Sequence, residues 1–285
     1  MTDAVGSFNY LQWQDKFKTE KPYYLYIDPP PGQPNANFVT SPGAPEIVHD
    51  VRGREHEFNL DDNGFAFARQ EFPLCTVTDE TIQKQYLPAM EVLIREYLKQ
   101  YCEIIWFDWR CRSSDKTKTS IPEGTKIKLD DRMIPLAPLR TVHVDQTPAA
   151  AIDRVKRHVS HERAEALLKK RVRILNVWRP MGAPVESFPL AFCDGSTVPQ
   201  DKLVEVDVVR HSFPGEAYYP LEYNGYKWHF MNKMTPDEVV IMKMNDTKPD
   251  VAAHCCPHAS FAQTEDADAI ARESIELRAL VFTDA

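Results

Sequence analysis

Residues 172–178, Val-Arg-Ile-Leu-Asn-Val-Trp, begin the part of the sequence that decides the fold. Their β-branched and aromatic content predicts a strand. Four further strand patterns follow in series, separated by clusters of Gly, Pro and Asp: 203–209, 226–231, 239–244 and 274–282. Strands in series without intervening helices indicate an antiparallel β core. We therefore predict a mainly β protein with flanking α-helices, and specifically a double-stranded β-helix, or jelly roll.

The predicted domain is single and has three parts. Residues 1–75 form an N-terminal arm, residues 76–140 supply a support helix, a strand and a loop, and residues 141–285 form the jelly-roll core. We expect the arm to wrap the core or to shape a substrate entrance, and a surface extension is the alternative. Its short strands are predicted at 23–27 and 65–68, on either side of a proline-dense stretch that favours extended loop.

Two helical stretches are expected outside the core. The first begins at a cap formed by Thr78 or Asp79 and runs to about Tyr101, with apolar residues every three or four positions. Pro88 interrupts that pattern and is expected to kink the helix. The remaining elements, in chain order, are a buried strand, a polar loop or lid, and a charged helix after Pro148: 103–109, 111–138 and 149–170.

The composition excludes several classes of partner. Lys plus Arg number 34 and Asp plus Glu number 42, which gives a net charge of −8 and no basic run, so nucleic acid is not expected. No apolar stretch approaches the roughly 18 residues that cross a bilayer, so no membrane partner is expected either. Six scattered cysteines and an N-terminus without a signal pattern favour a cytoplasmic enzyme with reduced thiols. A homodimer is left open.

A candidate metal site lies at the start of the core, in the motif Thr-Val-His-Val-Asp-Gln-Thr at 141–147. His143 and Asp145 are two residues apart, so on an extended strand their side chains point to the same face. A third ligand is expected from His258, which is favoured over His254 because it can emerge at the start of a strand. Two imidazoles and one carboxylate on one face of an iron ion leave positions open for a cosubstrate and oxygen. The pattern therefore predicts a non-haem iron oxygenase.

Other metal-ligating side chains are less suited to this role. His158 and His161 are three residues apart on the charged helix, but they lie among basic residues that repel a cation. Cys255 and Cys256 are adjacent and belong to no Cys-x-x-Cys motif, so we expect them to be buried as small apolar residues.

A binding site for a dicarboxylic acid is predicted on the last strand. Arg272 and Ser274 share one face, where a guanidinium and a hydroxyl suit the far carboxylate of such a molecule. Arg278 has the same parity, but Glu276 beside it would repel that carboxylate, so we favour Arg272. The alternative for Arg272 is a surface ion pair with an acidic neighbour such as Glu273.

Several runs taken together resemble a known family. They are residues 143–147, 176–180, 189–191, 236–239, 257–258 and 274–282. As a set they resemble the fungal hydroxylase/desaturase family of non-haem iron(II)/2-oxoglutarate oxygenases, which includes aspergillic acid hydroxylase, gibberellin desaturase and a cephamycin methoxylation subunit. The resemblance implies a jelly roll, Fe(II), the cosubstrates 2-oxoglutarate and O2, and a small-molecule secondary metabolite as substrate. It further implies hydroxylation or desaturation of an unactivated C–H bond, with release of succinate and CO2.

Polar and aromatic residues on two of the predicted strands are candidates for the substrate pocket. They are Asn176, Trp178, Arg179, Trp228 and His229. Two other functions remain open at this point. A zinc hydrolase would use the same ligands to activate water, and a jelly-roll binding module would use none of them catalytically.

Overall fold

The computed structural model describes residues 2–27, 29, 32–119, 131–210, 213–263 and 269–284. Strand β15 (Glu273–Thr283) is an inner strand of the five-stranded sheet with the longer strands, called here the larger sheet, and it pairs with a strand on each side. The sheet has the order β6-β13-β8-β15-β7 and is antiparallel throughout. Its other strands are β6 (Phe65–Arg69), β7 (Glu103–Ser113), β8 (Arg171–Met181) and β13 (Glu238–Asp246).

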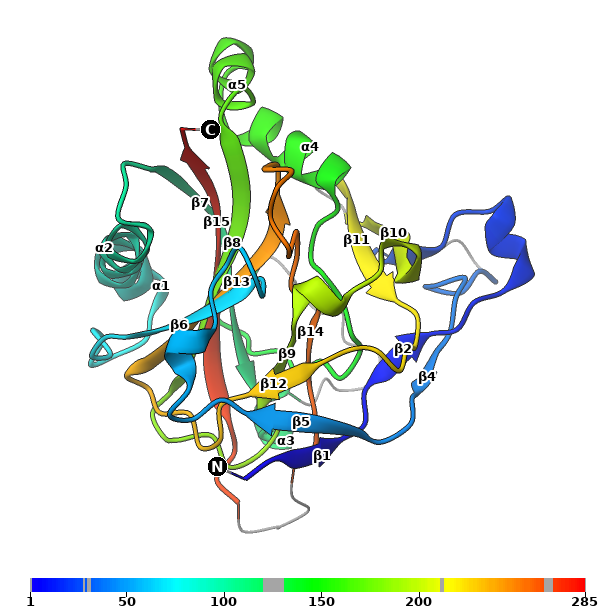
Figure 1. Ribbon diagram of the computed structural model, residues 1–285, viewed down its shortest axis with the longest axis horizontal. Helices are drawn as coiled ribbons and strands as arrows, with labels where there is room; N and C mark the ends of the chain where they lie inside the picture. Colours follow the sequence, from blue (N-terminus) through cyan, green and yellow to red (C-terminus); the bar gives the residue numbers. More distant parts are fainter. Residues whose placement is uncertain are drawn as a thin grey trace.

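A second five-stranded sheet lies across the core from the first (Figure 1). In sheet order its strands are β1 (Ala4–Gly6), β5 (Glu46–Asp50), β12 (Trp228–Phe230), β9 (Leu190–Cys193) and β14 (His258–Ser260). All neighbours are antiparallel except β5 and β12. The N-terminal arm therefore supplies β1 and β5 to this sheet and β6 to the first one, which a surface extension would not do.

Two smaller sheets stand beside this sandwich. One has the order β11-β10-β3 and the other pairs β2 with β4. Their strands are β2 (Asn9–Leu11), β3 (Tyr23–Leu25), β4 (Thr40–Pro42), β10 (Leu203–Val209) and β11 (Pro214–Pro220). The fold is thus the predicted one, a mainly β jelly roll with helices outside it. The exceptions to the predicted antiparallel pairing are the contacts of β3 with β10 and of β5 with β12.

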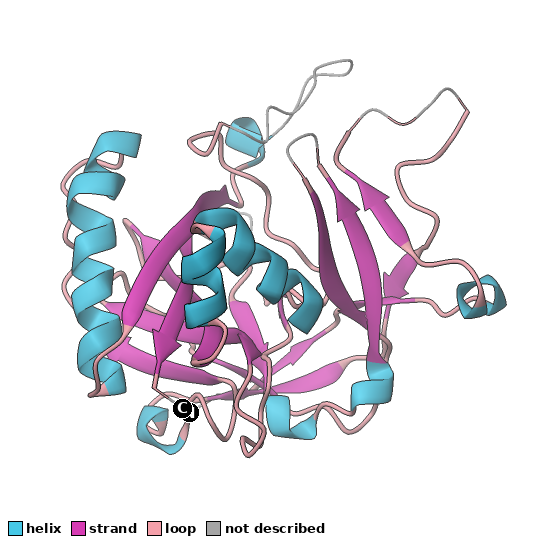
Figure 2. Ribbon diagram, turned by 90° about the horizontal axis from the view of Figure 1, so that it is seen from above, coloured by secondary structure: helices cyan, strands magenta, loops and turns pink. Residues whose placement is uncertain are grey.

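The predicted support helix packs on the outer face of the larger sheet (Figure 2). It begins with α1 (Asp79–Thr81), where Thr78 accepts a hydrogen bond from the Thr81 backbone, so Thr78 is the cap. It continues through the π-helical η3 (Ile82–Tyr86) into α2 (Leu87–Leu98). The kink expected at Pro88 stays a prediction; the helix is irregular in this π segment, which ends two residues before Pro88, and proline cannot donate the regular backbone hydrogen bond.

The charged stretch at 149–170 is two helices, so the prediction of one was wrong. They are α4 (Pro148–His158) and α5 (His161–Leu167). Val159 is extended and the Ser160 side chain accepts a hydrogen bond from the Arg163 backbone, which starts a new helix. The remaining helical turns are η1 (Asp15–Lys18), η2 (Glu55–Glu57), α3 (Lys116–Thr119), η4 (Gly195–Thr197) and η5 (Gln200–Lys202).

Part of the predicted loop or lid at 111–138 cannot be compared with the structure. β7 continues to Ser113 and α3 follows, but residues 120–130 lie outside the described residues.

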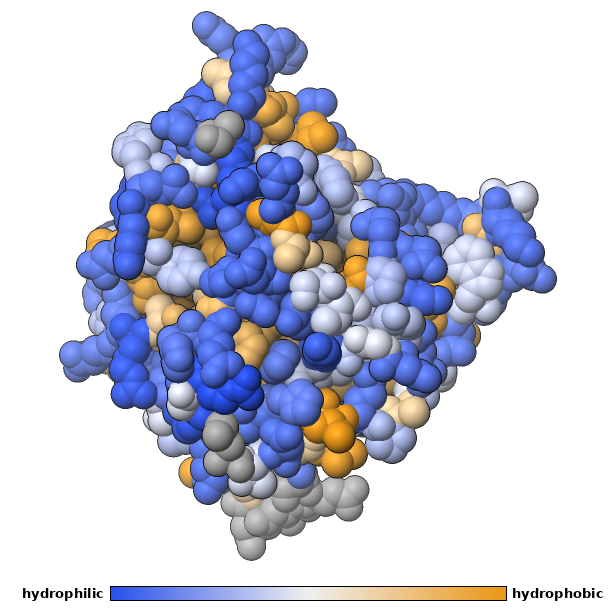
Figure 3. All heavy atoms as spheres, viewed as in Figure 1, coloured by the Kyte–Doolittle hydropathy of each residue, from blue (hydrophilic) through white to orange (hydrophobic). Residues whose placement is uncertain are grey.

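Within the described ranges, no helix is both long and apolar enough to cross a membrane. The face shown in Figure 3 is largely hydrophilic, with its apolar side chains in small separate groups.

Side chains alternate along β15 between two environments. Ile275 and Leu277 face outward into the cluster covered by α2. Residues of the other parity, such as Leu280, join the core between the two large sheets. Ser274, Glu276 and Arg278 share that parity, so this strand directs polar groups into the interior. Burying them is costly unless they are paired or bind a ligand.

Candidate metal centre

The motif at 141–147 crosses the interior as an extended segment held by single bridges. His143 forms an isolated β-bridge with His258, and Val144 forms one with Tyr218. The segment is therefore not the regular strand that was predicted. The expected orientation is nevertheless present, because Nε2 of His143 lies 3.9 Å from Oδ1 of Asp145. Thr147 then caps α4 through its side chain, which ends the segment.

The structure brings His258 to the same point. It is the first residue of β14, and its ring centroid lies 4.4 Å from that of His143. One potential ligand atom from each of His143, Asp145 and His258 lies within 4.8 Å of the other two. His254 is exposed and its Nδ1 faces a backbone carbonyl of Asp246, so it lies outside this group. The exposed helical pair at 158 and 161 also lies outside it.

Both imidazoles are oriented by backbone carbonyls. Nδ1 of His143 donates to Thr141 O at 2.9 Å, and Nδ1 of His258 donates to Cys256 O at 3.1 Å. A carbonyl only accepts, so Nδ1 carries the proton and Nε2 has a free lone pair. Nε2 of His258 is buried and has no hydrogen-bond partner among the described residues. This arrangement is typical of metal-binding histidines and fits a divalent cation.

The electrostatics of the group also suit a cation. Burial, with a smaller contribution from His258, lowers the pKa of His143 to about 3, so its imidazole is neutral and can act as a ligand. Burial opposes ionisation of Asp145, but Arg278 and the two imidazoles hold the pKa of this carboxyl well below its usual range. Asp145 also accepts a 2.6 Å hydrogen bond from Asn176 Nδ2. The carboxylate of Asp145 is therefore oriented and ionised, as an oxygen ligand of a metal must be.

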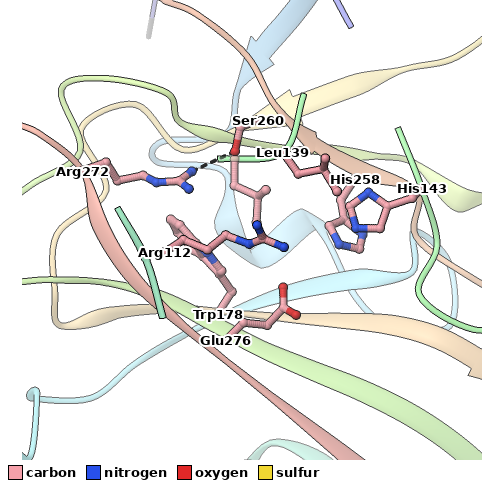
Figure 4. A pocket seen from close by; sticks show the side chains of 9 residues that line it. Arg112, Leu139, His143, Trp178, His258, Ser260, Arg272 and Glu276 are labelled. Carbon is pink, nitrogen blue, oxygen red and sulfur yellow. Dashed lines mark hydrogen bonds between the residues drawn. The ribbon is translucent and has the colours of Figure 1, made fainter. Parts of the chain in front are cut away.

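A narrow cavity connects the histidine pair with Arg272 (Figure 4). Nη1 of Arg272 donates to Phe188 O at 2.6 Å and to Ser260 Oγ at 2.8 Å. Nε and Nη2 of the same guanidinium, and the hydroxyl of Ser274, have no partner among the described residues although all three are buried. Burial and the nearby Arg112 lower the pKa of Arg272 to about 9. An anion in the cavity would satisfy these donors.

The surface ion pair considered for Arg272 is not formed. Arg272 is buried, and Glu273 beside it pairs with Lys118 instead. Arg278, the competing arginine, is fully engaged at the other end of the strand face. It pairs with Glu276 at 2.7 Å and with Asp145 at 3.0 Å. The two arginines therefore differ in their free hydrogen-bonding capacity.

The predicted pocket residues divide into two groups. Trp178 lines the narrow cavity, with its ring 5.7 Å from the guanidinium carbon of Arg272, and Asn176 contacts the carboxylate of Asp145. Arg179 lies on the opposite face of β8, because neighbouring residues of a strand point in opposite directions. Its guanidinium donates to backbone carbonyls of Gln70 and Pro236, which are the partners that a buried cation needs.

The remaining two pocket candidates on β12 also lie elsewhere. Trp228 stacks on Phe8 at 4.2 Å and donates from Nε1 to Glu46, on the outer side of the second sheet. His229 faces the inner side, but its ring packs against Phe58 and lines neither described cavity. Both Trp228 and His229 thus pack against other side chains of the fold, which is the alternative to a role in the substrate pocket.

Sequence reasoning missed Arg112 and Leu139, which also line the narrow cavity. Arg112 is the register partner of Ser274 across β7 and β15. It was missed because the sequence does not indicate which strand pairs with the last one. A second, wider cavity of about 1720 Å³ also opens onto His143 and Asp145.

Comparison with known proteins gives concordant matches over nearly the whole chain. A family model described as "Oxidoreductase/YMDC permease-like domain" matches residues 8–282. The hydroxylase/desaturase efuI of Hormonema carpetanum is 32% identical, covering 84% of this chain and 83% of the relative. The Fe(II)/2-oxoglutarate-dependent dioxygenase nvfI of Aspergillus novofumigatus is 31% identical, covering 93% and 92%.

A solved structure also matches. The iron and alpha-ketoglutarate-dependent endoperoxidase NvfI superposes with a TM-score of 0.81 at 28% identity, covering 100% of this chain and 99% of that one. The similarity therefore extends over the arm, the helices and both large sheets.

Proposed function

We infer the function of this chain from its membership of the fungal hydroxylase/desaturase family of iron(II)- and 2-oxoglutarate-dependent dioxygenases, to which it belongs. The protein is a non-haem iron dioxygenase that uses 2-oxoglutarate and O2. The relatives give no support to a zinc hydrolase or to a catalytically silent binding module. What remains to be proposed is the role of individual residues and the nature of the substrate.

We propose that His143, Asp145 and His258 hold the iron. The observation that carries this assignment is the buried group of three ligand atoms within 4.8 Å, with both imidazoles fixed by backbone carbonyls so that Nε2 is available. Asn176 and Arg278 hold the two carboxylate oxygens of Asp145, which fixes the orientation of that ligand.

We further propose that Arg272 and Ser274 bind the far carboxylate of 2-oxoglutarate. The support is the pair of unpartnered nitrogens on Arg272 and the unpartnered hydroxyl of Ser274, at the end of a cavity that starts at the two histidines. An arginine with two free N–H groups matches a carboxylate well, because both oxygens can accept at once.

When bound, iron(II) and 2-oxoglutarate supply the oxidising chemistry, in which 2-oxoglutarate and O2 yield succinate and CO2 while a substrate C–H bond is oxidised. The chain supplies placement and exclusion of water. Trp178 and Leu190 border the narrow cavity and limit its polarity, and the ion pair of Arg278 with Asp145 keeps the ligand carboxylate ionised.

The substrate is proposed to be a small-molecule secondary metabolite that enters through the wide cavity. A volume of about 1720 Å³ exceeds the few hundred to 1,000 Å³ typical of drug-sized ligands, so it can admit a polycyclic molecule. We also propose a cytoplasmic enzyme, a location that the six free thiols suit.

An anaerobic titration tests the metal and cosubstrate assignment. Iron(II) and 2-oxoglutarate added together should produce a weak visible charge-transfer band in the wild type. We expect the band to be lost in Asp145→Ala and kept in His254→Ala, with both variants folded as judged by circular dichroism. A band of wild-type intensity in Asp145→Ala would refute the ligand set, and loss of the band only in His254→Ala would exchange the two histidines.

A further inference from the structure

One face of α4 lines the wide cavity. Its cavity-lining positions recur at helical spacing, and they are Ala149, Ala150, Asp153, Arg154 and Arg157. The opposite positions, Ala151 and Val155, are buried in the core. Because α4 starts immediately after the metal motif, it joins the metal centre to the wall of the substrate cavity.

Three guanidinium groups surround one aromatic ring on this wall. The guanidinium carbons of Arg154, Arg157 and Arg210 lie 4.5, 4.3 and 5.9 Å from the centroid of Phe213. Arg154 also lies 4.7 Å from the centroid of Phe107, so two rings sandwich it. All five residues line the wide cavity. The rings hold the guanidinium planes in place without using their N–H donors.

The cluster lacks negative partners. Across the described ranges, none of these three arginines has a carboxylate within the 4.0 Å of an ion pair, and the Arg154 side chain makes no hydrogen bond. The acid that raises the pKa of Arg154 is Asp108, which is already paired with Arg132 and Arg278. Burial and the neighbouring Arg157 lower the pKa of Arg154 to about 10, as expected where like charges are held together.

A structural role explains only part of this arrangement. Arg157 donates to Pro214 O at 2.8 Å and so ties α4 to β11. Arg154 has no such bond, although it is half-buried in a protein with a net charge of −8 and many acids available. Binding of an anion would relieve the repulsion within such a cluster.

We propose that Arg154, assisted by Arg157 and Arg210, binds an oxyanion substituent of the organic substrate, of the carboxylate or sulfonate type. The proposal rests on the proposed function of the same cavity and adds the chemical class of substrate. Phe107 and Phe213 beside the guanidinium would contact the apolar part next to the anion. The substrate is then anchored at one end by α4 while its other end reaches the metal centre.

A pair of dyes that differ in one charge tests this site. 8-Anilinonaphthalene-1-sulfonate carries an oxyanion, and N-phenyl-1-naphthylamine is its neutral counterpart. With enzyme loaded anaerobically with iron(II) and 2-oxoglutarate, we expect the anionic dye to bind about tenfold or more tightly than the neutral one. Arg154→Met should weaken the anionic dye by about ten- to a hundredfold and leave the neutral dye unchanged, which is the effect of losing a hydrogen bond to a charged group.

The controls separate charge at this site from charge in general. Arg154→Lys keeps a cation and should lose less than Arg154→Met. Arg163→Gln removes the same charge from the neighbouring helix, where Arg163 pairs with Glu103 away from the cavity, and should bind both dyes as the wild type does. Unchanged binding of the anionic dye in both Arg154→Met and Arg157→Gln would overturn the proposal.

Two further readings complete the test. Sodium sulfate compared with sodium chloride at equal ionic strength measures binding of a free anion. Full displacement of the dye by submillimolar sulfate would assign the site to an inorganic ion and overturn the substrate class. The charge-transfer band is recorded on the same samples, and Arg154 lies outside the ligand group. Absence of this band in the wild type would therefore refute the proposed function independently of the dye result.

Discussion

Nη2 of Arg278 lies 3.0 Å from Oδ1 of Asp145, so the last long strand directly contacts a carboxylate of the 141–147 motif, more than a hundred residues earlier. Arg272 lies six residues before Arg278 with the same parity, which on a strand is a separation of roughly 20 Å. β15 thus presents one paired arginine beside Asp145 and one incompletely paired arginine at the far end. The two have different predicted effects when replaced.

Replacing Asn176 should weaken iron binding. Its amide donates to Asp145 Oδ2, and loss of such an outer hydrogen bond typically costs about ten- to a hundredfold in metal affinity. We expect that decrease in Asn176→Ala, measured by anaerobic calorimetry with iron(II). Asn63→Ala is the matched control, because Asn63 makes a similar 3.0 Å bond to Asp194 outside the site. Equal affinities in all three proteins would show that the bond does not orient the ligand.

Stability should fall on mild acidification because of His229. Burial lowers the pKa of His229 to about 4, whereas an unfolded histidine titrates near 6.5. The unfolded chain therefore binds the proton more readily than the folded protein does. The contribution of neutral His229 to the free energy of unfolding is complete above pH 6.5 and is lost as the pH falls toward 4. At about pH 5 this loss amounts to roughly 2 kcal/mol.

The contribution of His229 can be isolated with a ring that does not titrate. His229→Phe keeps an aromatic ring against Phe58 and Phe65. Urea unfolding at about pH 7.5 and about pH 5 should show that the variant loses roughly 2 kcal/mol less than the wild type between the two conditions. The same loss in both proteins would assign the acid sensitivity to other groups.

All six cysteines should titrate as free thiols. Cys75 is exposed and the other five are buried, and burial raises the pKa of Cys193 and Cys256 well above the usual value. A thiol reagent should therefore modify one cysteine quickly in the native protein and six after unfolding. Each disulfide would lower the second count by two, and any such deficit would contradict the proposed reducing compartment.

Strands such as β7, β8, β10, β13 and β15, and the proximity of His143 to Asp145, were predictable because short-range patterns specify them. Parity along a strand placed the side chains of His143 and Asp145 together and predicted the shared face of Arg272, Ser274 and Arg278. These inferences need only the alternation of side chains between the two faces of a strand, which can be recognised within a few residues of sequence. The break at Ser160 also has a local signal, a helix-capping serine, although the charged pattern on both sides obscured it.

Which pocket candidates line a described cavity depends on tertiary pairing. Arg179 and Trp178 are neighbours in sequence, and only the packing of α2 on the larger sheet decides which of them faces the cavity. β9 and β14 are too short, at four and three residues, for alternation to be recognised. The cluster around Phe213 joins α4 to the end of β10, a contact between distant segments that no local pattern encodes.

The final prediction distinguishes the two arginines of β15. Arg272→Leu should raise KM for 2-oxoglutarate by about one to three orders of magnitude, because a bidentate charge-assisted pair contributes a few kcal/mol. It should leave iron affinity near the wild-type value, since Arg272 does not touch the ligands.

Arg278→Leu should do the reverse, weakening iron binding by releasing Asp145 while KM changes little at saturating iron. Steady-state kinetics and anaerobic iron titration of both variants measure the two effects separately. If Arg278→Leu instead loses affinity for 2-oxoglutarate and Arg272→Leu keeps it, the cosubstrate lies at the other end of the strand face.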